Sequence, residues 1–439
     1  MEKSNPLYKA YVEILNRELV SAMGCTEPIA VAYCAAAARA ALGAVPERIL
    51  VEASGNIITN VKSVVVPHTG NRRGLAASAC AGALYGNEKA GLEVVSNASE
   101  EEIQSLGPYM EKTNVEVRPL VSDCLLDMII TVYAGASYAK VRIADEHTNI
   151  VRIEKDGEVL FKKALQAKQD GPDESIYELL TVKDIIDFAD TCDLDDVSDL
   201  LERMVTQNSA IAEEGLKKDY GANIGKVLLN TGTDVKTIAK AYAAAASDAR
   251  MNGCELPVVI CSGSGNQGIT TSLPVIVYAR AMNVSKDTLY RGILVSALTT
   301  IHAKTGIGRL SAYCGAVSAG AGAGAGIAYL NGGREAEISH TIVNALAITS
   351  GIVCDGAKSS CAAKIATAVE TGIFGYEMYC NGQQFYGGDG LVAKGVENTI
   401  DSFAKLARIG MRDTDRQIIM MMTGDSGKEE TDRVLQGSK

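Results

Sequence analysis

The sequence predicts an α+β protein in which a mainly helical domain of small-residue helices is joined by a separate α/β domain near the N-terminal third. The first observation is a composition of 47% apolar residues with 43 Gly, five Phe and no Trp in 439 residues. A core so poor in aromatic side chains must bring Ala-rich helices into close contact. The second is a change of hydrophobic period, from helical spacing to β-branched runs of strand length and back.

Residues 7–42 are expected to form two helices interrupted by GCTEP at 24–28. Apolar residues recur at three- and four-residue steps before the break, and an Ala-rich stretch follows it. Pro28 suits the first turn of a helix, because its missing N–H has no partner there. Thr26 is then the expected N-cap, which places Cys25 just ahead of a helix N-terminus, where a thiolate is favoured.

An α/β domain is expected over residues 46–170. Strand-length runs include RILVEAS, SVVVPHT, VEVRPLV, LLDMIITVYA, YAKVRIA and NIVRIEKDGEVLF, and the segments RGLAASACAGALYG and SEEEIQSLGPYME read as helices between them. Residues 1–45 are assigned to the helical domain as its N-terminal helices. Residues 171–439, where helical patterns dominate again, form the rest of that domain.

The composition excludes several classes of protein. A net charge of -11 provides no surplus of Lys and Arg for nucleic acid. Residues 310–330 carry no charge over a length that could span a bilayer, but they are mostly Ala, Gly and Ser, which favours a closely packed buried helix. Eleven cysteines without a dense framework, and no signal-peptide pattern, indicate a cytoplasmic protein with free or metal-bound thiols.

Two kinds of loop have the chemistry of a site. SGSGNQG at 262–268 comes before a helical stretch, and backbone N–H groups of such a turn bind carboxylate or phosphate, with the amides of Asn266 and Gln267 to orient the anion. It matches no nucleotide-binding motif. DEHTNI at 145–150 ends a predicted strand and presents His147 and Asn149.

Cysteines give the sharpest signal. Cys354 and Cys361 flank a turn that contains Asp355, Gly356 and Ser359. Their spacing fits neither a zinc finger nor a ferredoxin motif. Soft thiolates held on a glycine-containing turn between two helical segments nevertheless favour an iron–sulfur cluster or zinc.

Seven motifs together give the chain a resemblance to a known family. They are GCTEP (24–28), SGNIITNV (54–61), SDARMNG (247–253), SGSGNQGI (262–269), RLSAYCGA (309–316), IVCDGAKSSC (352–361) and TDRQII (414–419). In this order they resemble the L-cysteine desulfidase family, which is related to the iron–sulfur L-serine dehydratase alpha chain. The resemblance runs nearly from end to end. It implies a lyase that uses a [4Fe–4S] cluster, without pyridoxal phosphate, to break L-cysteine into pyruvate, ammonia and sulfide.

The resemblance also implies roles for particular residues. Enzymes of this kind use three cysteine ligands, whereas this sequence offers four, namely Cys25, Cys314, Cys354 and Cys361. We expect Cys25, Cys354 and Cys361 to bind, with Cys314 as the substitute for Cys361. Ser264, Asn266 and Gln267 are expected to bind the substrate carboxylate. The catalytic group is expected to include Glu27, His147 and Asn149, and the general base is left open among His147, Glu27 and a cysteine.

Two other functions fit the same residues. An iron–sulfur L-serine or L-threonine dehydratase would bind a hydroxyl substrate in the same way, and a cluster-binding sensor would bind a ligand without turnover. In each case the partner is a small molecule, an amino acid for the enzymes. The small-residue helices are suited to packing within one chain and between copies of it, so a homo-oligomer is compatible with the sequence.

Overall fold

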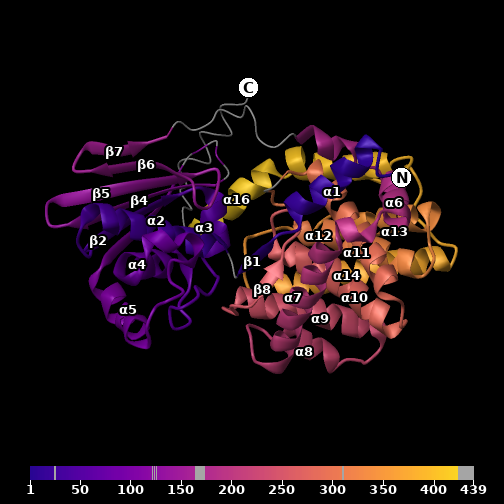
Figure 1. Cartoon of the computed structure of the whole chain (residues 1–439), viewed down its shortest axis with the longest axis horizontal. Helices are drawn as coiled ribbons and strands as arrows, with labels where there is room; N and C mark the ends of the chain where they lie inside the picture. The colour runs from indigo at the N-terminus through magenta and orange to yellow at the C-terminus, as the bar shows by residue number, and fades with distance from the viewer. Residues whose placement is uncertain are drawn as a thin grey trace.

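The chain forms two lobes that lie side by side, as the computed structural model in Figure 1 shows. The α/β lobe contains residues 26–163 and the helical lobe contains residues 1–23 and 174–423. The structure describes residues 1–23, 26–120, 122, 124, 126–163, 174–308 and 311–423. This arrangement confirms the predicted α+β class.

A six-stranded mixed sheet forms the centre of the α/β lobe. In spatial order its strands are β3 (Asn114–Pro119), β2 (Arg48–Ala53), β4 (Asp127–Ala134), β5 (Ser137–Ala144), β6 (Ile150–Lys155) and β7 (Glu158–Lys162). β2 and β3 pair in parallel, and the other neighbours are antiparallel. Alternate residues such as Ile49 and Val51 are buried, which is the period-two pattern that predicts a strand.

Helices α2 (Thr26–Leu42), α4 (Gly74–Tyr85) and α5 (Glu100–Lys112) lie on one side of this sheet in Figure 1. α2 contacts β4, β5 and β6, and its Ala-rich face lies in the core of the α/β lobe. The assignment of the second N-terminal helix to the helical domain was therefore wrong. Close approach explains the placement, because a Cβ on Gly82 of α4 would lie 1.9 Å from the Ala32 carbonyl oxygen.

One further local expectation was wrong. SVVVPHT does not form a strand, because only Val65 makes a bridge, to Arg73, and the chain then turns through His68. The helical lobe resumes with a 3₁₀ helix, η2 (Glu174–Leu179), and α6 (Val182–Thr191). Thr181 caps the second of these by accepting a hydrogen bond from the Asp184 N–H.

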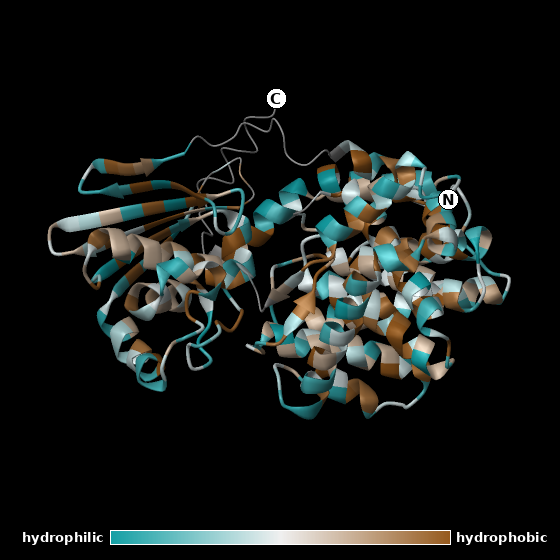
Figure 2. Cartoon of the chain, viewed as in Figure 1, coloured by the Kyte–Doolittle hydropathy of each residue, from teal (hydrophilic) through white to brown (hydrophobic). Residues whose placement is uncertain are grey.

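The helical lobe is a bundle around a second core. Its α-helices are α1 (Pro6–Glu18), α6, α7 (Ser198–Lys217), α8 (Ile224–Leu229), α9 (Val235–Met251), α10 (Gly265–Ala281), α11 (Lys286–Thr305), α12 (Gly315–Leu330), α13 (Glu335–Thr349), α14 (Cys361–Cys380), α15 (Val396–Lys405) and α16 (Arg412–Thr423). Smaller elements of the chain are α3 (Gly55–Val61), the 3₁₀ helices η1 (Glu88–Glu93) and η3 (Leu194–Asp196), and the π-helical turn η4 (Leu406–Gly410). Figure 2 shows hydrophobic residues within both lobes and hydrophilic residues along the outer turns.

Helix α12 lies in the middle of this bundle and explains the uncharged stretch of the sequence. One row of its glycines faces α14, where a Cβ on Gly324 would lie 2.4 Å from the Gly372 carbonyl oxygen. The other row faces α11, where a Cβ on Gly322 would lie 2.2 Å from the Thr300 hydroxyl. Within the described residues, no helix is long and apolar enough to cross a bilayer.

A two-stranded ribbon connects the start of the chain to the loop before α10. β1 (Ser21–Met23) pairs antiparallel with β8 (Pro257–Val259). α2 begins at Thr26, a few residues after β1, and the SGSGNQG segment follows shortly after β8. The ribbon thereby brings the entry to α2 near the entry to α10.

Candidate active site

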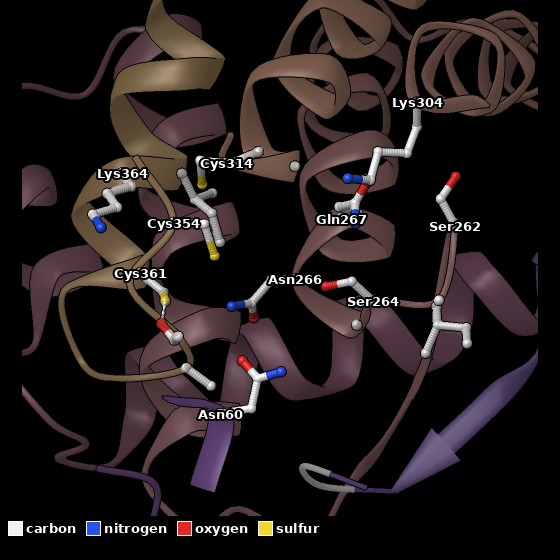
Figure 3. Close-up of a pocket in the computed structure, with 18 of the residues that line it drawn as sticks. Asn60, Ser262, Ser264, Asn266, Gln267, Lys304, Cys314, Cys354, Cys361 and Lys364 are labelled. Atoms are coloured by element: carbon white, nitrogen blue, oxygen red, sulfur yellow. Dashed lines mark hydrogen bonds between the residues drawn. The ribbon is translucent and has the colours of Figure 1, made fainter. Parts of the chain in front are cut away.

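A cavity of about 180 Å³ lies between the lobes. Thr26, Glu27, Asn60 and His147 of the α/β lobe line it on one side. Residues of the loops before α10, α12 and α14 line the other side, and Figure 3 shows the three labelled thiols gathered there, opposite the side chains of the SGSGNQG segment. Neither lobe encloses this cavity alone.

A short backbone bridge brings Cys314 next to Cys354. Tyr313 and Val353 form an isolated antiparallel bridge, and the Cys314 N–H donates to the Ile352 carbonyl at 3.1 Å. The Cys354 N–H donates in turn to the Ala312 carbonyl at 2.5 Å. Two segments forty residues apart are thus held in register, and each presents its thiol to the cavity.

Cys361 completes the set of thiols at the first turn of α14, as Cys314 does at the N-cap of α12. The loop between Cys354 and Cys361 packs directly on α3. Gly356 has a φ of 85°, and a Cβ there would lie 2.0 Å from the Thr59 carbonyl oxygen. Only glycine allows this loop to turn so close to the α/β lobe.

The surroundings of Cys354 favour its thiolate. A hydrogen bond from the Cys314 thiol, helped by the Gly356 N–H and the Lys364 and Lys358 ammonium groups, lowers the pKa of Cys354 to about 6. The same pairing raises the pKa of Cys314. Because thiolates rather than thiols bind metals, Cys354 is prepared to act as a ligand near neutral pH.

The SGSGNQG segment forms a tight turn that opens directly into α10. Ser262 and Gly263 both have positive φ, at 49° and 75°, and Cys261 and Ser264 exchange backbone hydrogen bonds across the turn. No side chain caps α10 at Ser264. The first N–H groups of this 17-residue helix therefore stay available for an anion.

The two amides that follow are held differently. Asn266 Oδ1 lies 3.3 Å from the Ser247 hydroxyl and accepts a long hydrogen bond, 3.4 Å, from the Arg250 guanidinium. Gln267 is 5% exposed, and its Oε1 has no hydrogen-bond partner in the described part of the chain. Gln267 thus lines the cavity, and its side-chain oxygen remains able to accept a hydrogen bond.

His147 reaches the cavity from the turn after β5. Its Nε2 is buried and lacks a hydrogen-bond partner among the described residues. Burial lowers the pKa of His147, against the opposing effect of the Glu27 carboxylate. The imidazole is therefore neutral at neutral pH, with a ring nitrogen that is able to take up a proton.

The structure brings together most of the residues expected from the sequence. Glu27, His147, Ser264, Asn266, Gln267, Cys314, Cys354 and Cys361 all line the cavity. Asn149 does not, because its amide donates to the Ala144 carbonyl at 2.9 Å and accepts from Lys163 at 2.8 Å, outside the cavity. Cys25 lies outside the described residues.

Several lining residues were not predicted from the sequence, among them Asn60, Arg250 and Lys304. Asn60 lies within the SGNIITNV motif and donates to Glu27 at 3.4 Å. Arg250, also within a noted motif, packs its Nε against Gly265 at the start of α10. Lys304 gave no signal, because a lysine in the last turn of a helix is common on any protein surface. Burial lowers the pKa of Lys304 to about 8, against the effect of Cys354 and Cys314.

Comparison with known proteins assigns the chain to a family. The sequence matches the family described as serine dehydratase alpha chain over residues 75–420. The chain belongs to this family. The relation to serine dehydratase alpha chains that the seven motifs indicated is therefore confirmed.

Relatives of the chain match it almost over their full length. A UPF0597 protein of Desulfitobacterium hafniense is 55% identical over 425 residues, which are 96% of this chain and 98% of that protein. A UPF0597 protein of Lachnoclostridium phytofermentans is 47% identical, with 95% and 100% covered. A third, from Treponema denticola, is 45% identical, with 95% and 98% covered.

Proposed function

We propose that this protein is an iron–sulfur lyase of the serine dehydratase type, and that its substrate is L-cysteine, which it converts to pyruvate, ammonia and sulfide. The observation that carries the proposal is the convergence of three thiols, a neutral histidine and a helix N-terminus on one cavity. These groups come from four separate parts of the chain, around residues 147, 265, 314 and 354–361, so their meeting is not a by-product of sequence proximity. A C–S lyase that uses an iron–sulfur cluster can use them as base, anion site and cluster ligands.

The donor set is suited to a [4Fe–4S] cluster. Among the described residues, no three His, Cys, Asp or Glu side chains are grouped closely enough to hold a single metal ion. Soft thiolates are the ligand type of iron–sulfur clusters, and three thiols line this cavity. Cys314, Cys354 and Cys361 would hold the cluster, which makes Cys314 a ligand in addition to Cys361 rather than in its place. When bound, such a cluster supplies a Lewis-acidic iron for the sulfur of the substrate.

The residues of the chain account for the other steps. The free N–H groups at the start of α10 bind the substrate carboxylate, and Gln267 accepts from the substrate ammonium. His147 Nε2 removes the α-proton, and the Cβ–S bond breaks as sulfide leaves. The aminoacrylate product tautomerises to an imine, and one water hydrolyses it to pyruvate and ammonia. Glu27, close to His147, stabilises the imidazolium that forms.

The test is an anaerobic assay of the full chain after reconstitution with iron and sulfide. We expect a broad visible absorption from the cluster and equal yields of sulfide and pyruvate from L-cysteine. L-Serine dehydration is the second candidate, and membership of the serine dehydratase alpha chain family favours it. Pyruvate from L-serine at a higher kcat/KM than from L-cysteine would select that candidate. Absence of product from both amino acids would refute the lyase.

A further inference from the structure

Lys304 is a buried cation on the wall of the cavity. It lies in the last turn of α11 and is only 6% exposed. Within the described part of the chain, its ammonium makes no hydrogen bond and no ion pair. Other partly buried lysines of the helical lobe do have carboxylate partners, as Lys240 does with Glu370 at 2.5 Å and Lys358 with Asp355 at 2.9 Å.

The other described cations on the cavity wall are already engaged. Lys364 pairs with Asp355 and donates to the Val353 carbonyl at 2.9 Å. Arg250 packs on Gly265 and donates to Asn266. Lys304 is therefore the described lining cation that makes no direct hydrogen bond or ion pair, and the thiols of Cys354 and Cys314 act on its charge only through space. A buried lysine that lines a cavity and has no direct partner is suited to bind an anion from outside the chain.

The surroundings of Lys304 indicate where that anion binds. In Figure 3 the Lys304 and Gln267 side chains reach toward the same part of the cavity, from α11 and from the first turn of α10. Uncapped N–H groups at the start of α10 provide further donors. A helix N-terminus and an ammonium together favour a carboxylate over a neutral group.

We propose that Lys304 is a substrate-binding residue that pairs with the carboxylate of the amino acid at the start of α10. It fixes which end of the substrate faces α10, so that the α-carbon is presented to His147 and the side chain to the thiols. This inference rests on the proposed function, because it takes an amino acid as the occupant of the cavity. It extends that proposal by requiring a free carboxylate, which excludes amino-acid amides and peptides joined through the carboxyl group.

The experiment compares two probes that undergo no C–S cleavage. L-Alanine has the carboxylate, whereas L-alaninamide is nearly the same size without that charge. Binding of each to the full chain, with and without reconstituted cluster, is measured by calorimetry at neutral pH for the wild type, Lys304→Met and Lys304→Arg. Lys240→Met is the matched control, because it removes a partly buried lysine that already has a carboxylate partner.

We expect the wild type to bind L-alanine more tightly than L-alaninamide by roughly 10- to 100-fold, the range of a hydrogen bond to a charged group. Lys304→Met should abolish that preference, Lys304→Arg should keep most of it, and Lys240→Met should leave it unchanged. With L-cysteine, Lys304→Met should raise KM more than it lowers kcat. The unfolding temperature of Lys304→Met should not be lower than that of the wild type, since the substitution removes a buried charge that has no direct partner.

Two outcomes would overturn the inference. The first is that Lys304→Met keeps the full preference for L-alanine over L-alaninamide. The second is that the wild type binds the two probes equally well or binds neither. The proposed function fails differently. A wild type that discriminates through Lys304 yet turns over neither L-cysteine nor L-serine would refute the lyase and leave the carboxylate site intact.

Discussion

At the scale of single residues, the thiols of this protein differ in pKa according to where they lie. Cys354 has its pKa lowered by hydrogen bonds and nearby ammonium groups, whereas buried Cys34 and Cys80 have theirs raised by burial. The first is suited to bind metal and the other two to pack as small apolar groups. Environment rather than residue type decides which thiols do chemistry.

Replacement of a thiol in the cavity tests the ligand set. Cys354→Ser, Cys314→Ser and Cys361→Ser should each lower bound iron and visible absorption after reconstitution, because hydroxyls are poor ligands for soft iron–sulfur sites. Cys80→Ala is the control, since this thiol lies in the core of the α/β lobe. Iron and acid-labile sulfide per chain are the measurement. Full iron content in Cys314→Ser would remove that residue from the set and point back to Cys25.

Protonation of His147 is expected to produce the acid limb of the profile of kcat/KM against pH. Because burial holds the pKa of His147 below its ordinary value of 6.5, kcat/KM should fall only when the pH drops below that value, as the base becomes protonated. Folding stability should decline over the same interval, because the unfolded chain takes up the proton first. His147→Gln should lower kcat by about 10²- to 10⁴-fold and remove this limb. An unchanged limb in that variant would assign it to another group.

At the scale of elements, the helix entries position the chemistry. Cys314 and Cys361 occupy the starts of α12 and α14, and the anion cradle is the start of α10. These helices can present their N-termini to one small cavity because they pack at backbone contact. Gly320, Gly324 and Gly372 make that contact possible.

Close packing of α12 on α14 can be tested with a single methyl group. Gly372→Ala would place a Cβ 2.0 Å from the Gly320 carbonyl oxygen, so one helix must move. We expect a loss of about 1–3 kcal/mol in the free energy of unfolding, with reduced cluster content because Cys314 and Cys361 are displaced. Gly351→Ala is the control, since nothing lies within 4 Å of its Cβ. Denaturant unfolding measures both, and equal stability would contradict the tight contact.

At the scale of the whole molecule, the candidate site is formed only where the two lobes meet. His147, Glu27 and Asn60 come from the α/β lobe, while the thiols and the anion cradle come from the helical lobe. Asn252 joins the two, since its Oδ1 accepts from Arg73 at 3.0 Å and from Ser359 at 3.0 Å. The loop that presents Cys354 is thereby linked to the α/β lobe.

Weakening this link should affect catalysis more than folding of either lobe. Arg73→Met removes the hydrogen bond to Asn252, a loss of roughly 1.5–3 kcal/mol for a bond with a charged donor. We expect kcat/KM to fall by about tenfold or more and amide exchange to rise in α3 and in the loop at 355–360. Arg118→Met, which breaks an exposed pair with Glu116, should change neither. Normal kinetics in Arg73→Met would show that the lobes stay docked without this contact.

The sequence by itself determined much of this protein. Hydrophobic period revealed the sheet strands and most helices, because side chains alternate every two residues in a strand and about every 3.6 in a helix. Motif residues named eight of the residues that line the cavity, since Gly-rich turns, amides and thiols have distinctive chemistry in any context. The fold class followed from the change of hydrophobic period, together with the many Ala and Gly residues that allow helices to pack at close distance.

Only the tertiary structure decided which of these groups meet. Asn149 and His147 lie two positions apart in one loop, yet hydrogen bonds turn one away from the cavity and leave the other facing it. α2 belongs to the sheet rather than to the helical bundle, because its alanines permit contact with α4. Lys304 became a site residue only when its burial and missing partner were visible. Burial, pairing and pKa depend on neighbours distant in the chain, and local sequence does not contain them.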